Sequence, residues 1–504
     1  MQYDVENTIY KFVSIGIKVC MLTGDKLETA KSIASSCKLT SPDMSFIHLV
    51  NPFDSIEKLE NNLLDLYNKE YKNNTNKKYC LVVTGETFSK ITQNQNTINL
   101  FANLFTLSDT IICCRVSPKQ KAELVHIIKS FNPDKSALAI GDGANDVGMI
   151  SEADVGIGIE GIEGTEAARA SDFCLSQFSY LQKLLLFHGR ESYRRNSFYI
   201  IYEFYKNIVF TAPFFYFGFI NFFSGESFYD GLLIQLFDMI YSVFPMFYFA
   251  IYDREYKIEL YTERPEIYLS GLQRKFFNNK IFWKNMILGF IEGLMITINC
   301  CCFYEMNNKG YSDDDVISLG IIVFSGVVVS INVKVLLRVC IFDFILIILI
   351  ILSVGSFYLT IYLLSTDDLH KLLDLAELGD LMIKDFSYDN ILGTNDNLIS
   401  QRKYFIFFLF VIFFVCFIDL AVNRINFKYI KNTFKPNESF YLFQKDKYLI
   451  DGINKGVFIH NDIDNDKEKN FIDDDRELLK NQNIKDINFN NSINAENNGV
   501  EMDI

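Results

Sequence analysis

Six long apolar runs follow residue 197 and set the strongest limit on what this chain can fold into. Each is close to the ~20 residues that a helix needs to cross the apolar layer of a membrane. The runs cover residues 198–223, 232–252, 286–303, 317–333, 341–364 and 404–422. They predict an all-α membrane domain of six transmembrane helices over residues 198–425. An even number of spans puts both ends of this domain on one side of the membrane.

Basic residues gather in the segments before the first run, between alternate runs and after the last run. The positive-inside rule makes these segments cytosolic. The acidic loop 365–402 then lies on the opposite side. We therefore expect a multi-pass integral membrane protein with a cytosolic linker over 177–197 and a cytosolic tail over 426–504. The basic residues are Arg190, Arg194, Arg195, Arg254, Lys257, Arg264, Arg274, Lys275, Lys280, Lys284, Lys334, Arg338, Arg424, Lys428, Lys431 and Lys435.

Charge and cysteine usage exclude several other classes of protein. The net charge of -14 argues against nucleic-acid binding, because a phosphate backbone attracts a basic surface. Much of the acid lies in the Asn-rich tail, whose composition predicts disorder. The eleven cysteines lack the C-x-x-C spacing of zinc sites. The soluble parts are therefore expected in a reducing, cytosolic compartment.

Residues 1–176 alternate between strand-like apolar runs and helical patterns. Residues 16–22 and 136–140 are predicted strands, and each ends in a turn that opens a helix, over 26–37 and 146–152 respectively. This alternation predicts an α/β domain with a parallel sheet and helices on both faces. The Asn- and Lys-rich segment 54–79 is interpreted as a surface insertion.

Three segments of this α/β domain have the chemistry of phosphate handling. The first is Thr23-Gly24-Asp25, between a predicted strand and a predicted helix. Its hydroxyl, its flexible glycine and the free amides of the helix start suit an anion. A structural alternative is a helix cap, because Asp25 followed by Glu28 has the spacing of a capping box.

The second segment runs from Arg115 to Lys121. Ser117 is the predicted N-cap and Pro118 the first residue of a helix, with Gln120 as the reciprocal capping partner. Lys121 then falls in the first helical turn, where the helix dipole disfavours a cation. A lysine held there suits a transferring phosphoryl group. The alternative is an ordinary solvated lysine.

The third segment is the run from Gly141 to Asp146, at the carboxyl end of a predicted strand. Parallel sheets bind ligands at that end. Asp142, Asn145 and Asp146 offer hard oxygen ligands to Mg²⁺. A turn with helix-capping residues is the alternative.

Taken together, the segments resemble the P-type ATPases, and specifically their phospholipid-flipping branch. The resemblance rests on MLTGDKLETA, CCRVSPKQKAELV, AIGDGANDVGMI, ADVGIGIEGIEG and ARASDF in the soluble part, and on HGRESYRRN, FYKN and VKVLL beyond it. It covers roughly residues 1–425. It implies a phosphorylation domain of the haloacid-dehalogenase fold, which is Rossmann-like, followed by membrane helices.

The resemblance also implies roles for residues at the matching positions. Thr23, Gly24 and Asp25 would hold phosphate and nucleotide, Arg115 would contact the nucleotide, and Lys121 would bind phosphoryl oxygens. Asp142 would carry Mg²⁺ with support from Asp146, and Asn145 would hydrogen-bond the phosphate. The implied catalytic residues are thus Lys121, Asp142 and Thr23, and the implied reaction transfers phosphate from ATP to an aspartate and then hydrolyses it.

Within the membrane domain, Lys206 lies about two turns inside the first run. A buried intramembrane lysine is costly, and its default interpretation is functional. Snorkelling to the membrane surface is the alternative. The resemblance places Lys206 beside the path of the lipid headgroup. We predict a polar cluster of Lys206, Asn207, Asp238 and Ser242, with Glu203 one turn away as a partner.

The sequence also departs from the family pattern. The motif Asp-Lys-Thr-Gly, which carries the phosphorylated aspartate, does not occur. The nucleotide-binding domain, the actuator domain and the first four spans would precede residue 1. We therefore expect an incomplete phosphorylation domain whose sheet lacks a strand, and a chain that is inactive without an N-terminal part, in the same or a separate chain.

Two other functions stay open at this point. Glu203, Asp238 and Glu292 also suit a P-type cation pump, because intramembrane carboxylates mark ion paths. A non-catalytic membrane scaffold is the second alternative. The resemblance further implies a phospholipid substrate and admits a two-span accessory subunit, bound at the outer loops 223–230 and 365–402.

Overall fold

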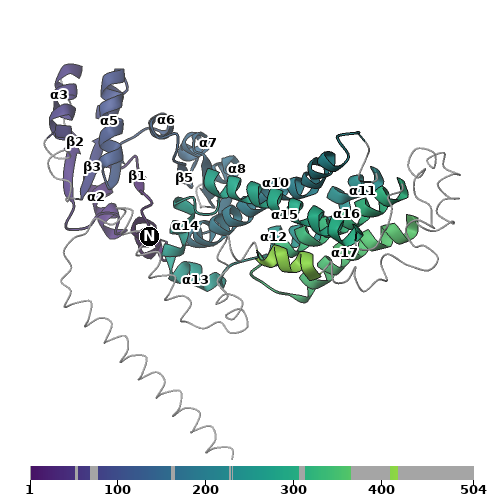
Figure 1. Cartoon of the computed structure of the whole chain (residues 1–504). Helices are drawn as coiled ribbons and strands as arrows, with labels where there is room; N and C mark the ends of the chain where they lie inside the picture. Colours follow the sequence, from purple (N-terminus) through teal and green to yellow (C-terminus); the bar gives the residue numbers. More distant parts are fainter. Residues whose placement is uncertain are drawn as a thin grey trace, which may run out of the picture. The chain divides into compact units, whose positions relative to one another are not determined.

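The computed structural model describes residues 2–50, 55–68, 78–160, 165–225, 229, 231–305, 313–364 and 409–417. The chain divides into two units, Met1–Val422 and Asn423–Ile504, and every described residue belongs to the first. The predicted tail and the predicted outer loop 365–402 lie outside the described residues. Strands and short helices make up the purple and blue part of Figure 1, and most of the long helices lie in its teal and green part.

Four parallel strands form the first sheet, in the order β1-β4-β3-β2. All six residues of β3 are buried, which fits a strand covered on both faces. The parallel pairing confirms the predicted α/β class for this region. The strands are β1 (Cys20–Leu22), β2 (Ser45–Leu49), β3 (Tyr79–Thr84) and β4 (Thr110–Cys114).

Helices cover both faces of this sheet, as the sequence predicted. Successive residues of β3 point to opposite faces, so that Val82 packs with α1 and α2 while Leu81 packs with α3 to α6. In α3, within the predicted insertion, Leu59 and Leu63 are fully buried, so this part of the segment contributes to the core. The helices are α1 (Val5–Ser14), α2 (Leu27–Ser36), α3 (Ile56–Leu66), α4 (Gly85–Ile91), α5 (Gln95–Leu107) and α6 (Pro118–Phe131).

A second parallel sheet has the order β5-β6-β7. Val125 of α6 and Met149 of α7 bury Ala139 on β5. Among the described strands, β1 and β5 do not pair, so each sheet ends there; a sheet that lacks a strand was the expectation. The elements are β5 (Leu138–Gly141), the 3₁₀ turn η2 (Ala144–Asp146), α7 (Val147–Glu152), β6 (Val155–Ile159), α8 (Glu166–Ala170) and β7 (Phe173–Leu175).

Four helical stretches among the described residues are long and apolar enough to cross a membrane: Gly231–Tyr252, Asn279–Cys301, Leu319–Leu336 and Phe344–Leu363. The helix α10 (Arg190–Ile220) covers the first predicted span but is not one of the four; it carries Glu203 and Lys206. Only 409–417 of the sixth predicted span is described, and these residues are helical. The described residues thus confirm that the chain contains several helices long and apolar enough to cross a membrane.

The stretch Gly231–Tyr252 is interrupted by a π-helical turn, and the other spans are continuous helices. The turn opens the hydrogen-bond ladder, and the Tyr241 carbonyl accepts from Asn332 Nδ2 at 3.3 Å and from Ser353 Oγ. Such turns often occur at functional sites. The elements are α11 (Gly231–Leu236), η4 (Phe237–Tyr241), α12 (Val243–Tyr252), α15 (Asn279–Glu305), α16 (Asp313–Leu336) and α17 (Phe344–Leu364).

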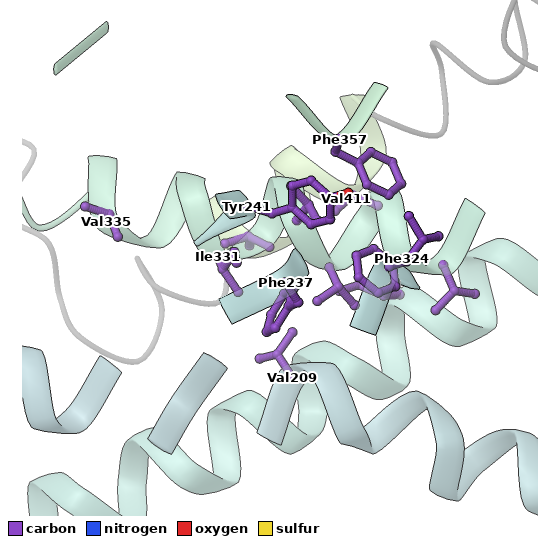
Figure 2. Packing of buried hydrophobic residues seen from close by; sticks show 14 of the residues in the cluster. Val209, Phe237, Tyr241, Phe324, Ile331, Val335, Phe357 and Val411 are labelled. Atoms are coloured by element: carbon purple, nitrogen blue, oxygen red, sulfur yellow. The ribbon is translucent and has the colours of Figure 1, made fainter. Parts of the chain in front are cut away.

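Aromatic rings fill the centre of the membrane helices (Figure 2). Phe324 of α16 stacks on Phe357 of α17, with ring centroids 5.4 Å apart, and meets Phe237 and Tyr241 of η4 edge-on. Offset and edge-on pairs of this kind add about 0.5–1.5 kcal/mol each beyond the area they bury. They fix η4 against α16 and α17, next to the polar residues that follow it.

Short helices occupy the predicted linker over 177–197 and the basic segment after the second predicted span. Residues 180–189 form α9 (Tyr180–Gln182) and a π-helical turn, η3 (Lys183–Gly189), which leads directly into α10. The basic segment after α12 folds into α13 (Ile258–Glu263), η5 (Pro265–Tyr268) and α14 (Leu269–Leu272). Lys334 was counted as a loop charge, and this was wrong: it lies in α16 and is 2% exposed.

Candidate functional site

The first and second phosphate segments lie side by side. The Thr23 amide donates to the Cys113 carbonyl at 2.9 Å, and the Arg115 amide donates to the Asp25 carbonyl at 3.1 Å. Thr23 Oγ1 accepts the Asp25 amide at 3.1 Å and so closes the turn. Asp25 does not cap α2: the N-cap is Lys26, without a side-chain bond, so the capping-box alternative was wrong. Gly24 and Asp25 are exposed and available to a ligand.

Arg115 directly follows β4 and has a left-handed backbone, with φ of 54°. Residues other than glycine seldom adopt this conformation, which is commonest at functional turns. The turn brings the Arg115 carbonyl so close to Gly85 that a Cβ there would lie 2.2 Å from the oxygen. The side chain of Arg115 is exposed at the carboxyl end of the sheet.

The predicted capping box at the start of α6 is confirmed. Ser117 accepts the Gln120 amide at 3.4 Å, and Gln120 Oε1 accepts the Ser117 amide at 2.8 Å. The Gln120 side chain also donates to the Gly85 carbonyl at 2.8 Å, a contact that the sequence did not predict. These bonds fix the first turn of α6, and with it Lys121.

Lys121 joins the second segment to the third. Its Nζ lies 2.8 Å from Asp146 Oδ1, and both side chains are mostly buried, at 12% and 13% exposure. A mostly buried pair is screened less by salt than a surface pair. The solvated-lysine alternative is therefore wrong. This ion pair places the Lys121 ammonium next to the segment that follows β5.

The third segment turns sharply after β5. A Cβ on Gly141 would lie 2.2 Å from Asp146 Cβ, so only glycine fits this close approach. Asp142 and Asn145 are exposed, whereas Asp146 is half-buried against Lys121. The structure thus brings all three predicted segments to the carboxyl ends of β1, β4 and β5, with carboxylate and amide oxygens facing solvent.

The donor set of the third segment fits Mg²⁺. This ion typically takes one or two protein carboxylates and completes its shell with water and phosphate oxygens. Asp142 is exposed and Asp146 is one turn away. The described residues contain no group of three or more His, Cys, Asp or Glu that could hold a metal ion. The set therefore suits an ion that arrives with a phosphate ligand.

The second predicted cluster lies in the membrane helices. Lys206 is 4% exposed, and its Nζ lies 2.8 Å from Glu203, 3.1 Å from Asp238 and 3.2 Å from Ser242 Oγ. Snorkelling is therefore wrong for Lys206. Asp238 belongs to η4 and Ser242 directly follows it. Asn207 is exposed, and the described contacts do not bring its side chain to Lys206.

The comparisons with known proteins now decide the family. Residues 168–437 match the family model described as phospholipid-translocating P-type ATPase C-terminal. The chain belongs to this family. It is an integral membrane family, in agreement with the several candidate spans among the described helices.

Three curated relatives show how much of a flippase this chain spans. Phospholipid-transporting ATPase C887.12 of Schizosaccharomyces pombe is 38% identical over 61% of this chain and 25% of its own length. Phospholipid-transporting ATPase DRS2 of Saccharomyces cerevisiae is 37% identical over 60% and 22%. Probable phospholipid-transporting ATPase IM of Homo sapiens is 32% identical over 68% and 31%. The chain therefore spans less than a third of each relative.

One polar cluster among the described helices was not predicted as a site. Glu292 of α15 and Lys334 of α16 form a buried ion pair, and Tyr205 of α10 contacts both. Glu292 was noted only as one of several intramembrane carboxylates. Its partner was missed because the two residues are 42 positions apart and no local periodicity connects them.

Proposed function

We propose that this chain is the C-terminal part of an ATP-driven phospholipid flippase that works through an aspartyl-phosphate intermediate. Six membrane helices, α10 and the helix around 409–417 included, would then follow a cytosolic phosphorylation domain over 1–176. The observation that carries the lipid part of the proposal is Lys206. It is a cation buried in the middle of a membrane helix, and two carboxylates and a hydroxyl beside a π-helical turn hold it.

The Lys206 cluster could bind a lipid headgroup by exchanging its existing partners for headgroup oxygens. The ammonium already has three partners, Glu203, Asp238 and Ser242. A headgroup phosphate could replace one of these partners, because phosphate and carboxylate oxygens accept hydrogen bonds from an ammonium with similar strength. The 66% exposure of the Asp238 side chain makes that carboxylate the readily displaced partner. Lipid would thus bind by competing for Lys206.

On the phosphorylation domain, the three segments support phosphoryl transfer. The ion pair with Asp146 positions Lys121, whose ammonium could neutralise phosphoryl oxygens. The exposed Thr23-Gly24-Asp25 turn and Arg115 would hold the phosphate and the nucleotide, and Asn145 would hydrogen-bond the phosphate. A Mg²⁺ ion held there would supply charge neutralisation to the phosphate. Asp142 and Asp146 would hold that ion, and the chain's own residues otherwise position and stabilise charge.

The cation-pump alternative is less well supported by the geometry. Its three candidate carboxylates are all engaged with lysines: Glu203 and Asp238 with Lys206, and Glu292 with Lys334. A cation would therefore compete with a lysine ammonium for each of these carboxylates. A two-span accessory subunit remains part of the flippase proposal, as does the acceptor aspartate, which the N-terminal part of the enzyme would supply.

Lipid-stimulated ATP hydrolysis of Lys206→Ala in the full-length enzyme tests the proposal. We expect the lipid concentration for half-maximal stimulation to rise at least about tenfold, while phosphoenzyme formation from ATP and Mg²⁺ persists. Thr211→Val is the matched control on the same helix, because its hydroxyl contacts only backbone carbonyls of α10. Unchanged lipid transport in Lys206→Ala, or stimulation by a cation instead of lipid, would refute the proposal.

Immunoblotting tests the proposed extent of the enzyme. An antibody against residues 436–504 should detect a membrane polypeptide more than twice the 58.3 kDa of this chain. A band at the mass of the chain itself would require the acceptor aspartate to come from another polypeptide. In either case, this chain expressed alone should take no acid-stable phosphate from ATP.

A further inference from the structure

The membrane helices contain a second buried lysine–carboxylate pair, well inside their apolar core. Lys334 Nζ lies 3.1 Å from Glu292 Oε1, and the two side chains are 3% and 1% exposed. Two charges in an apolar core are expensive, and such a pair stabilises a fold no better than apolar residues of the same shape. Its presence between α15 and α16 therefore calls for a role beyond stability.

The pair lies where α15 packs most closely on α10. Gly289 and Gly293 of α15 have the four-residue spacing that lets membrane helices approach. A Cβ on Gly293 would lie 2.6 Å from Ala212 Cβ, and one on Gly289 would lie 3.2 Å from Tyr205 Cδ2. Glu292 lies between the two glycines and also contacts α10, because the Tyr205 hydroxyl donates to its carboxylate.

Tyr205 of α10 is bound by both members of the pair. Its hydroxyl donates to Glu292 Oε2, and Lys334 Nζ lies 4.7 Å from the centre of its ring. Tyr205 is 1% exposed, and a cation over an aromatic ring is attracted to its face. The tyrosine is therefore held at both its hydroxyl and its ring, which fixes the rotation of α10 at this level.

Fixing Tyr205 also fixes its neighbour Lys206. Consecutive side chains on a helix diverge by about 100°, because a turn takes ~3.6 residues. With Tyr205 directed at α15 and α16, Lys206 is directed at Asp238 and Ser242 of the interrupted second span. A rotation of α10 that released Tyr205 would withdraw Lys206 from these partners.

Among the described residues, the space beside the pair is too small for a lipid headgroup. The cavity beside Glu292 has a volume of about 10 Å³, room for about one water, and Met295, Ile296, Asn299, Val411, Phe414 and Val415 line the rest of it. We propose that Glu292 and Lys334 are positioning residues that hold Tyr205 and thereby aim Lys206 at the lipid. This inference rests on the proposed lipid function of Lys206.

Tyr205→Phe in the full-length enzyme is the sharpest test, because it removes only the hydroxyl that Glu292 holds. We expect the lipid concentration for half-maximal ATPase stimulation to rise roughly tenfold, as for the loss of one bond to a charged acceptor. The rate of phosphoenzyme formation should not change. Glu292→Gln should produce the same shift. The matched control is Thr297→Val in α15, because this buried hydroxyl contacts only the Gly293 carbonyl.

A double variant separates positioning from stability. If Tyr205 acts through Lys206, Tyr205→Phe should add no further shift in a Lys206→Ala background. Additive shifts, or a Tyr205→Phe enzyme as responsive to lipid as Thr297→Val, would overturn the inference while Lys206→Ala still supports the proposed function. A wild-type enzyme without lipid stimulation would overturn the proposed function and this inference with it.

Discussion

Replacing Arg194 by Met tests how much a buried ion cluster at the start of α10 stabilises the protein. The cluster consists of Arg190, Glu191, Arg194, Asp253 and Glu255. Arg194 lies 2.9 Å from Glu191 and 2.8 Å from Asp253, and the side chains of these carboxylates are 1% and 0% exposed. Asp253 in turn accepts two backbone amides, of Cys340 and Ile341. The cluster thus joins α10 to the segments after α12 and after α16.

The charges of the cluster set the expected magnitude. Two arginines face three carboxylates, so removing Arg194 leaves one arginine against three buried or half-buried carboxylates. Breaking a buried pair from one side costs about 3–5 kcal/mol. At about 2–4 °C per kcal/mol, the unfolding temperature of the protein in detergent should fall by roughly 10 °C. Circular dichroism during heating measures this.

Arg195→Met is the matched control, one residue along the same helix. Arg195 is half-buried, and its guanidinium donates to the backbone carbonyls of Glu191 and Ile251. Replacing Arg195 by Met should lower the free energy of unfolding by about 1 kcal/mol. Equal effects of the two arginine variants would show that packing of the arginine stems, and not charge pairing, stabilises this region.

The pH dependence gives a second check on the same reasoning. Burial raises the pKa of Glu191, but Arg194 and Arg190 lower it by more, so its pKa lies below the usual range. A carboxyl with a depressed pKa stabilises the folded state above its unfolded pKa of about 4.3, and this stability is lost as pH falls through the folded pKa. Without Arg194, the burial of Glu191 is no longer offset by this arginine, and the pKa of Glu191 in the folded state rises. The deficit of Arg194→Met should then shrink from pH 7 to pH 5; a constant deficit would refute the charge argument.

Two further predictions concern the phosphorylation domain. Gly141→Ala should displace Asp146 and lower phosphoenzyme formation by about 10²-fold, whereas Gly148→Ala, whose Cβ meets nothing nearer than 3.6 Å, should leave it unchanged. Burial raises the pKa of the Cys80 thiol to about 12, so that iodoacetamide at pH 8, followed by mass spectrometry, should label the exposed Cys174 at least about a hundredfold faster. Equal labelling of both cysteines in folded protein would contradict this burial.

The sequence could predict the phosphate segments because their signals are local. Thr23-Gly24-Asp25 and the loop from Gly141 each follow a strand, and parallel strands end at one edge of a sheet. The capping box from Ser117 to Gln120 is also a local signal, because its residues are consecutive in the sequence.

The membrane sites were predicted less completely because their contacts are between distant helices. Lys206, Asp238 and Ser242 came together as expected, while Asn207 faces outward on α10, since neighbours on a helix point in different directions. Lys334 was misassigned because a cation near the end of an apolar run resembles a loop charge. Only the packing of α15 against α16 reveals that Glu292 compensates its charge.

These sites meet on one helix. The ion cluster holds α10 at Arg194, and the Glu292–Lys334 pair holds it at Tyr205, eleven residues later, or about 16 Å at ~1.5 Å per residue. No proline lies between these positions; Pro213 comes after Lys206. Sharp helix kinks usually occur at proline or at a π-bulge, and the described α10 has neither between these two positions. If the proposed function holds, a displacement of the Arg194 end of α10, just after the π-helical turn η3, would be transmitted along this helix to Lys206.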